Sequence, residues 1–354
     1  MEKSSILDER STSVLNAIID SYIKRPDPVG SRTISKNFDF RLSPSSIRNV
    51  MSDLEDLGFV LQPHTSAGRI PTDKGYRYFV DHLNKSTHLA KADLNTIKEC
   101  NLDQASSLED LLSQTSNILS DLSRLAGVVV VCKIDSATLK RIQFIKLSEG
   151  RVLVVCVLGA EFIQQKVIQL ENETNQDELD RITNFFNSNF VGFTLKGIRN
   201  ELLDQIKNEK KRFDELHTKA MKFSEMILED ENNDGKIFLG PTSNIFDLPE
   251  FQDDVQKMKL IFQAFEEKTR LVGILDQCLD ENAVTIIIGS ELVNHNMQDC
   301  SVVARTYADQ NQVLGTLGII GSKRMDYQRS IALVEYMASR ISNILSGEKL
   351  DFIR

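Results

Sequence analysis

The residues of this chain that are best suited to binding another molecule lie between positions 27 and 81. The densest group begins a helix after Ser43 and consists of Ser45, Ser46, Arg48, Asn49 and Ser52. An arginine offers paired donors to the O6 and N7 atoms of guanine, and an asparagine suits adenine or a phosphate. Serine hydroxyls and the free N–H groups of a helix start suit phosphate oxygens. This group predicts base and phosphate contacts in a DNA major groove.

A second set of polar and basic residues surrounds this helix in the sequence. Some of them occupy the polar tip at residues 63–67 and the position just after it, where small donors can approach a nucleic-acid backbone. Others lie at the start of the next helix, where two basic side chains could neutralise phosphates, or at the start of the preceding short helix. The complete second set is His64, Thr65, Ser66, Arg69, Lys74, Arg77, Ser31 and Arg32.

Apolar spacing and cap residues predict the elements that hold these side chains. The third helix has Ser43 as its N-cap and Pro44 in the favoured first position, and Gly58 ends it. In order, we expect helices at 7–23, 32–38 and 44–57, extended segments at 59–62 and 68–71, and a helix at 72–83. Three helices, a hairpin and a closing helix make a winged helix-turn-helix.

Beyond residue 84 the sequence predicts an α+β fold. Strands are followed by a largely helical block and then by strands again, which indicates one sheet domain interrupted by an insertion. The expected helices are 107–125, 176–190, 198–228, 251–279 and 326–345, and the expected strands are 128–134, 142–147, 152–158, 162–170, 283–288, 301–307 and 313–320.

Three stretches of the N-terminal region closely resemble the HrcA family of heat-inducible transcription repressors. They are Asp27-Pro28-Val29-Gly30-Ser31-Arg32-Thr33-Ile34-Ser35, Ser43-Pro44-Ser45-Ser46-Ile47-Arg48-Asn49-Val50-Met51-Ser52-Asp53-Leu54-Glu55, and residues 62–81, which begin Gln62-Pro63-His64-Thr65-Ser66-Ala67-Gly68-Arg69. The matches are long and specific, and none of the positions assigned to DNA contact departs from them. The organisation of the rest of the chain is also similar.

The resemblance implies a domain plan and a function. The plan is a winged-helix reader at 1–84, a GAF-like domain at 85–194 and 279–354, and a dimerisation domain inserted at 195–278. The function is repression of chaperonin and Hsp70-type chaperone operons through an inverted repeat called CIRCE. The chaperonin GroEL promotes the active repressor, and unfolded protein titrates GroEL during heat stress, so that repression falls.

A homodimer also agrees with physical reasoning, because one winged helix reads too few base pairs to select a site in a genome. A two-fold dimer reads both arms of an inverted repeat. Apolar faces on the helical block suit such an interface, although they could instead pack within one subunit. The expected interface residues are Ile198, Leu202, Leu203, Ile206, Val255, Met258, Ile261, Phe262 and Phe265.

Composition limits the other possibilities. The net charge is −9, yet residues 1–85 carry 12 Lys and Arg against 11 Asp and Glu, so the remainder carries −10. An acidic body with a near-neutral reader suits local DNA binding rather than global coating of DNA or membranes. No signal peptide or membrane-spanning run is evident. Five widely spaced cysteines indicate reduced thiols in a cytoplasmic protein.

Three alternative functions compete with a dimeric repressor. A regulator that senses a small molecule through the GAF-like domain is the strongest of these, although few polar residues interrupt the apolar strands. An enzyme would need a nucleophile–base pair, a metal cluster or a phosphate loop, and the sequence has none, nor does it indicate a cofactor. An RNA-binding protein would need exposed aromatic side chains for stacking, which the third helix does not supply.

Overall fold

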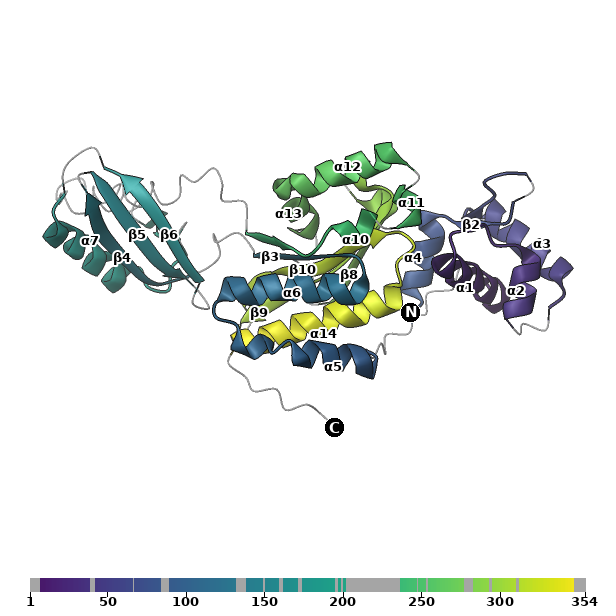
Figure 1. Cartoon of the computed structure of the whole chain (residues 1–354), viewed down its shortest axis with the longest axis horizontal. Helices are drawn as coiled ribbons and strands as arrows, with labels where there is room; N and C mark the ends of the chain where they lie inside the picture. Colours follow the sequence, from purple (N-terminus) through teal and green to yellow (C-terminus); the bar gives the residue numbers. More distant parts are fainter. Residues whose placement is uncertain are drawn as a thin grey trace.

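The structure is a computed structural model of the 354-residue chain. It describes residues 7–38, 42–65, 67–83, 89–131, 138–148, 150–158, 162–170, 174–194, 197–198, 200–201, 236–246, 248–252, 254–276, 283–292, 295–309 and 312–346. Figure 1 shows an N-terminal unit at one end, a central sheet covered by helices, and a smaller sheet at the other end.

The N-terminal unit (residues 7–83) contains its elements in the order expected from the sequence. A cap begins each of its longer helices: the Asp8, Ser43 and Thr72 side chains accept backbone N–H groups. Ser31, by contrast, is the first residue of its helix, and Gly30 occupies the cap position without a side-chain bond. The elements are α1 (Glu9–Lys24), α2 (Ser31–Asn37), α3 (Pro44–Asp56), β1 (Val60–Leu61), β2 (Ile70–Pro71) and α4 (Asp73–Asp81).

Beyond residue 89, the described residues form a five-stranded antiparallel sheet with helices on both faces. The strand order is β7-β3-β10-β9-β8, and we call it the central sheet. Its strands are β3 (Ala126–Val131), β7 (Ile237–Leu239), β8 (Thr285–Ile288), β9 (Cys300–Asp309) and β10 (Gln312–Ser322). Its helices are α5 (Lys91–Glu99), α6 (Leu108–Ser123), α10 (Ser243–Phe246), α11 (Pro249–Gln252), α12 (Val255–Glu266), α13 (Lys268–Asp276) and α14 (Tyr327–Leu345), and short 3-10 turns lie at Leu102–Gln104, Gly289–Glu291 and His295–Met297.

Alternation along the strands explains why the central sheet is buried on both faces. Val129 faces α6 and α14, in a core that continues into the N-terminal unit. Val128 and Val130 face the opposite side and pack with α12 and α13. Figure 1 shows these two helical layers on opposite sides of the sheet. Strands with two buried faces read as continuous apolar runs, which is how 128–131 reads in the sequence.

A separate three-stranded sheet lies between β3 and β7 in the chain. It has the order β4-β5-β6 and all its pairs are antiparallel; we call it the small sheet. Helix α7 packs on one face, and the two build a core of their own that includes Phe144, Cys156 and Phe186. The elements are β4 (Leu139–Ser148), β5 (Arg151–Leu158), β6 (Phe162–Gln169) and α7 (Gln176–Asn189).

The position of the inserted unit corrects the sequence prediction. We expected the strands at 142–170 to join those at 283–320 in one sheet, with an insertion at 195–278. Instead, the strands of the small sheet pair only with each other among the described residues, and α12 and α13 pack on the central sheet. Periodicity identifies a strand but not its partner, so the sequence pattern could not separate the two sheets.

The residues expected at the dimer interface have different environments in the structure. Ile198 is buried in the core of the small sheet, and Ile261 and Phe265 are buried against the central sheet. These three side chains therefore pack within the subunit, which was the alternative reading of the helical faces. Phe262 is 49% exposed, Met258 is partly exposed, and α12 begins at Val255. Leu202, Leu203 and Ile206 lie outside the described residues.

Gly75 allows α4 to approach the segment that leads into β1. A Cβ atom at this position would overlap the carbonyl oxygen of Phe59. We expect Gly75→Ala to lower the free energy of unfolding by about 1–3 kcal/mol, the usual cost of overpacking. Gly273→Ala is the control, because a Cβ atom at that helical position would meet none of the described residues, and it should be neutral or stabilising by up to about 1 kcal/mol. Urea denaturation followed by circular dichroism measures both. Equal stability of Gly75→Ala and the unmodified protein would contradict this close approach.

Candidate nucleic-acid interface

Helix α3 separates an apolar face from a polar one. Ile47, Val50, Met51 and Leu54 are buried in the N-terminal unit. The side chains between them point outward: Ser45, Arg48, Asn49 and Ser52 are exposed and Ser46 is partly exposed. The Ser43 hydroxyl accepts the Ser46 N–H at 3.1 Å, which fixes the start of the helix. The polar face therefore projects from the first three turns of a firmly capped helix.

The hairpin beside α3 is held by two side chains. Glu55, near the end of α3, accepts the Gln62 N–H at 3.1 Å and pairs with Arg69 at 2.7 Å. The Gln62 amide donates to the carbonyl oxygens of Thr65 at 3.1 Å and Ala67 at 2.9 Å across the tip. His64 and Thr65 are exposed at that tip, whereas Ser66 lies outside the described residues. Arg69 thus fastens the hairpin to α3.

The base of the hairpin lies against the segment before α2. Val29 and Arg69 exchange both backbone hydrogen bonds at 2.9 Å. The backbone approaches so closely here that a Cβ atom on Gly68 would overlap the Val29 carbonyl. Arg32 is exposed and Ser31 is partly exposed at the start of α2. The hairpin, α2 and α3 are therefore held as one surface.

The two basic residues of α4 have partners inside the protein. Lys74 donates to the Leu57 carbonyl oxygen at 2.7 Å and lies over the Phe59 ring, 4.4 Å from its centroid. Arg77 forms a two-pronged pair with Glu291, in which Nε lies 2.8 Å from Oε1. It also donates to the Ile286 carbonyl oxygen at 2.6 Å. Arg77 therefore faces the central sheet, which corrects the prediction that it neutralises a phosphate.

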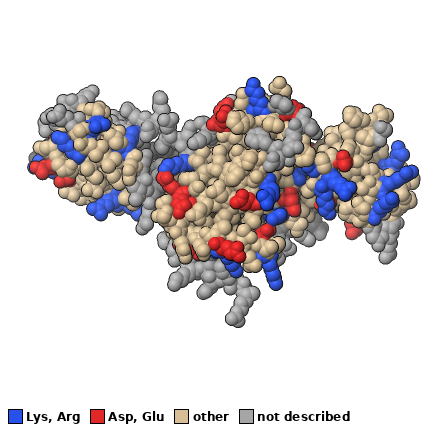
Figure 2. Space-filling model, in the orientation of Figure 1, with Lys and Arg blue, Asp and Glu red and all other residues tan. Residues whose placement is uncertain are grey.

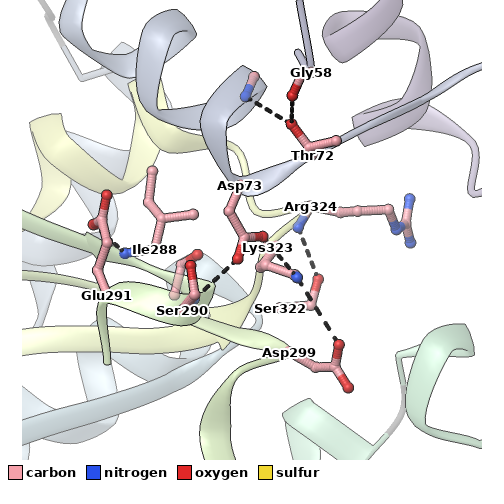
Figure 3. Close-up of polar contacts among 12 residues, drawn as sticks. Gly58, Thr72, Asp73, Ile288, Ser290, Glu291, Asp299, Ser322, Lys323 and Arg324 are labelled. Carbon is pink, nitrogen blue, oxygen red and sulfur yellow. Dashed lines mark hydrogen bonds and ion pairs between the residues drawn. The ribbon is translucent and has the colours of Figure 1, made fainter. Parts of the chain in front are cut away.

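A polar contact that the sequence did not reveal joins the start of α4 to the central sheet (Figure 3). Asp73 accepts the Lys323 ammonium and the Ser290 N–H at 2.8 and 2.9 Å. Burial alone would raise the pKa of the Asp73 carboxyl, but these hydrogen bonds lower it below its usual value. The carboxylate is therefore charged at neutral pH, and the contact weakens only as the pH falls through the acidic range of that lowered pKa.

A cavity of about 620 Å³ adjoins this contact, between the N-terminal unit and the central sheet. Its charged lining is mostly paired: Lys257 with Asp299 at 2.8 Å, and Arg324 with Glu250 at 2.9 Å. The hydroxyl of Tyr76 is buried there and has no hydrogen-bond partner in the part of the chain that the structure describes. Among the described residues, no group of three or more His, Cys, Asp or Glu side chains could hold a metal ion.

The charge distribution differs between the parts of the molecule. On the face shown in Figure 2, blue areas predominate over red on the N-terminal unit at the right, while both signs mix over the centre. In the described part of the chain, no helix is both long and apolar enough to cross a membrane. Among the described residues, Cys100, Cys156 and Cys300 are free thiols.

Comparison with known proteins identifies the family. The model of the HrcA protein C-terminal domain matches residues 109–331. A heat-inducible transcription repressor HrcA from Geobacter sulfurreducens is 38% identical over 97% of this chain and 99% of its own length. This chain belongs to the HrcA family. Its HrcA relative from Syntrophobacter fumaroxidans is 35% identical over 96% of this chain and 98% of its own.

A solved structure supports the same overall fold. A crystal structure of a hypothetical protein has a TM-score of 0.59 and 21% identity, and it covers 96% of this chain and 99% of its own. The α+β class expected from the sequence is therefore confirmed, and so is the membership of the HrcA family that the N-terminal stretches indicated.

The geometry of the hairpin generates a test. Gln62→Ala removes two hydrogen bonds across the tip, each worth about 1 kcal/mol. We expect amide exchange within residues 62–69 to become about tenfold faster or more, because the free energy of local opening falls by ~1.4 kcal/mol or more. Hydrogen-exchange mass spectrometry measures it. Arg48→Ala, an exposed change on the adjacent helix, should leave the exchange of the hairpin unaltered. Unchanged exchange in Gln62→Ala would show that Gln62 does not hold the tip.

Proposed function

We propose that this chain is a heat-inducible transcription repressor that binds DNA and lowers transcription of heat-shock genes. The N-terminal unit acts as a winged helix-turn-helix in which α3 enters the major groove and the hairpin is the wing. One observation carries this assignment: Ser45, Arg48, Asn49 and Ser52 are exposed together on the capped start of α3. The HrcA relatives, which are named heat-inducible transcription repressors, match nearly the whole chain.

The proposed DNA contacts follow from the exposure of each side chain. Arg48 and Asn49 read base edges, and the serines near the helix start bind phosphates. The tip of the hairpin and the start of α2 touch the backbone on either side. Arg69 and Lys74 stabilise the wing through their contacts within the unit, and they approach the phosphates from its base. The proposed set is Ser31, Arg32, Ser45, Ser46, Arg48, Asn49, Ser52, His64, Thr65, Ser66, Arg69 and Lys74.

The repressor acts as a homodimer in this proposal, because a single reader covers too few base pairs for a unique site. The dimer reads both arms of an inverted repeat, which the family resemblance identifies as CIRCE. The central sheet and its helices form the GAF-like domain. The chaperonin GroEL promotes the active state, again as the resemblance implies.

The open face of the small sheet suits the dimer contact. Helix α7 covers one face, and on the other Leu147 and Val167 are 51% and 52% exposed. Leu153 pairs with Ile145 and Val167 on the neighbouring strands, so that these apolar side chains form one row. An apolar row of this kind is typical of an interaction surface. A second copy of the same face would bury it symmetrically.

Regulation by a small molecule is a second candidate, and the cavity of about 620 Å³ favours it, because its volume is within the usual range for ligand sites. The cavity lies between the N-terminal unit and the central sheet rather than inside the sheet domain. Its lysines and arginine at positions 257, 323 and 324 are already paired with carboxylates. A charged ligand would have to displace those pairs, so this function ranks second.

Arg48→Ala tests the proposed reader. If Arg48 contacts a base, the change should weaken binding to the inverted-repeat operator by about 1–3 kcal/mol and leave binding to random DNA nearly unchanged. Fluorescence anisotropy at fixed salt measures both affinities. Arg181→Ala is the matched control, because this exposed arginine lies on α7, which covers the opposite face of the small sheet. Equal losses on operator and random DNA would instead make Arg48 a phosphate contact.

Val167→Lys tests the proposed dimer surface. The position is exposed, so the subunit should fold, but a lysine there would be desolvated in the dimer. We expect the dimer dissociation constant to rise by about tenfold or more, the equivalent of ~1.4 kcal/mol. Sedimentation over a concentration series measures it. Val191→Lys is the control, since Val191 is 50% exposed but follows α7 instead of lying on the open face. An unchanged dissociation constant in Val167→Lys would exclude this face.

A further inference from the structure

Helix α4 belongs both to the N-terminal unit and to the surface of the central sheet. Its residue Tyr76 is 2% exposed and packs in the same continuous core as the helices of the N-terminal unit. The Tyr76 ring also lies 6.0 Å from the ring of Tyr327, the first residue of α14. In Figure 1, α4 lies between α1 and the central sheet. A single helix therefore fixes the orientation of the N-terminal unit relative to the central sheet.

The first polar contact of α4 is at its N-terminus. Asp73 accepts hydrogen bonds from Lys323 and from the Ser290 N–H, as Figure 3 shows. Gly289 has a φ of +52°, and a Cβ atom there would overlap the Asp73 carboxylate. The turn at Gly289–Glu291 is thus shaped to receive this side chain. Asp73 also stabilises the positive end of its own helix.

The second contact lies one turn further along α4. Arg77 pairs with Glu291 through two nitrogen atoms and donates to the Ile286 carbonyl oxygen. Glu291 is itself held in place, because it accepts the Ile288 N–H at 2.9 Å. A two-pronged arginine–carboxylate pair fixes direction as well as distance.

The third contact reaches α1 rather than α4. Arg324 donates to the carbonyl oxygens of Tyr22 at 2.9 Å and Ile23 at 3.1 Å, in the last turn of α1. A cation at a helix C-terminus satisfies carbonyl groups that lack partners in the helix and meets the negative end of the dipole. Arg324 also pairs with Glu250 at 2.9 Å, so the central part of the protein holds it from the other side.

We propose that Asp73 and Arg77 are positioning residues that set the distance and angle between the two DNA-reading helices of the dimer. Three contacts at separate points, together with the buried Tyr76, prevent the N-terminal unit from rotating on the central sheet. The position of each α3 relative to the rest of its subunit is then fixed, and so is the half-site spacing that the dimer accepts. This inference rests on the proposed function, because it requires a dimer that reads two arms.

The test measures affinity against spacing with the full-length dimer. A series of duplexes carries the two operator arms with the central spacer lengthened in single base-pair steps up to about 10 bp, one helical turn. For the unmodified protein we expect a sharp optimum, with affinity about 100-fold or more lower at about 5 bp, where the arms face opposite sides. The variants are Asp73→Asn with Arg77→Gln, and separately Gly289→Ala, which displaces Asp73 without removing a charge.

Both variants should flatten the spacing profile, so that the penalty at half a turn falls by about tenfold or more. Binding to a single arm should stay within about threefold, because α3 itself is unaltered. Arg305→Gln, which removes the Arg305–Glu335 pair within the central part, should leave the profile unchanged.

A second measurement, made without DNA, distinguishes the positioning role of Asp73 and Arg77 from the proposed repressor function. Amide exchange at Ser290, whose N–H donates to Asp73, should rise in both variants. Faster exchange with an unchanged spacing profile would overturn the positioning role, and unchanged exchange would overturn the contact itself. A wild-type protein that binds one arm as tightly as two would refute the proposed function, whatever the exchange at Ser290 showed.

Discussion

The burial of Tyr76 in the core that the N-terminal unit shares with the central sheet is the constraint on which the rest of this structure depends. Because the ring is buried, α4 cannot leave the central sheet without exposing a large aromatic side chain to water, at a cost of several kcal/mol. The ion pairs around it are partly exposed and each adds only about 1 kcal/mol or less. What these ion pairs contribute is the orientation of the N-terminal unit on the central sheet. Burial holds the N-terminal unit in place, and the charged contacts determine its angle.

In the proposed account, the surface that reads DNA and the surface that forms the dimer lie at opposite ends of the molecule. The N-terminal unit presents α3 and the hairpin at one end of the molecule, and the small sheet with its open apolar face lies at the other end (Figure 1). The central sheet connects them: β3 leads towards the small sheet, and β7 returns beside β3 in the same sheet. An inserted unit that leaves and returns at neighbouring strands disturbs the central core little.

The sequence predicted most elements well because the signals that define them are local. Ser43, Pro44 and Gly58 mark the two ends of α3 within one residue of its observed limits. Alternation and apolar runs likewise located the described strands of both sheets except β7, which lies in a stretch where we predicted no element. What the sequence could not supply was long-range: which strands pair, and which side chains meet. Arg77 and Glu291 are 214 positions apart, so nothing near Arg77 indicated that its charge serves a contact within the protein.

In the proposed function, this protein recognises a two-armed DNA site through paired copies of α3. The most direct measurement is fluorescence anisotropy of the purified protein on a duplex with the CIRCE inverted repeat, against a scrambled duplex at the same salt concentration. We predict that the protein binds the inverted repeat about 100-fold or more tightly than the scrambled duplex, and that this preference is lost when one arm is deleted. This threshold of about 100-fold lies below the usual ratio of specific to non-specific affinity. Equal, weak binding to both duplexes, also after addition of GroEL and ATP, would contradict the account.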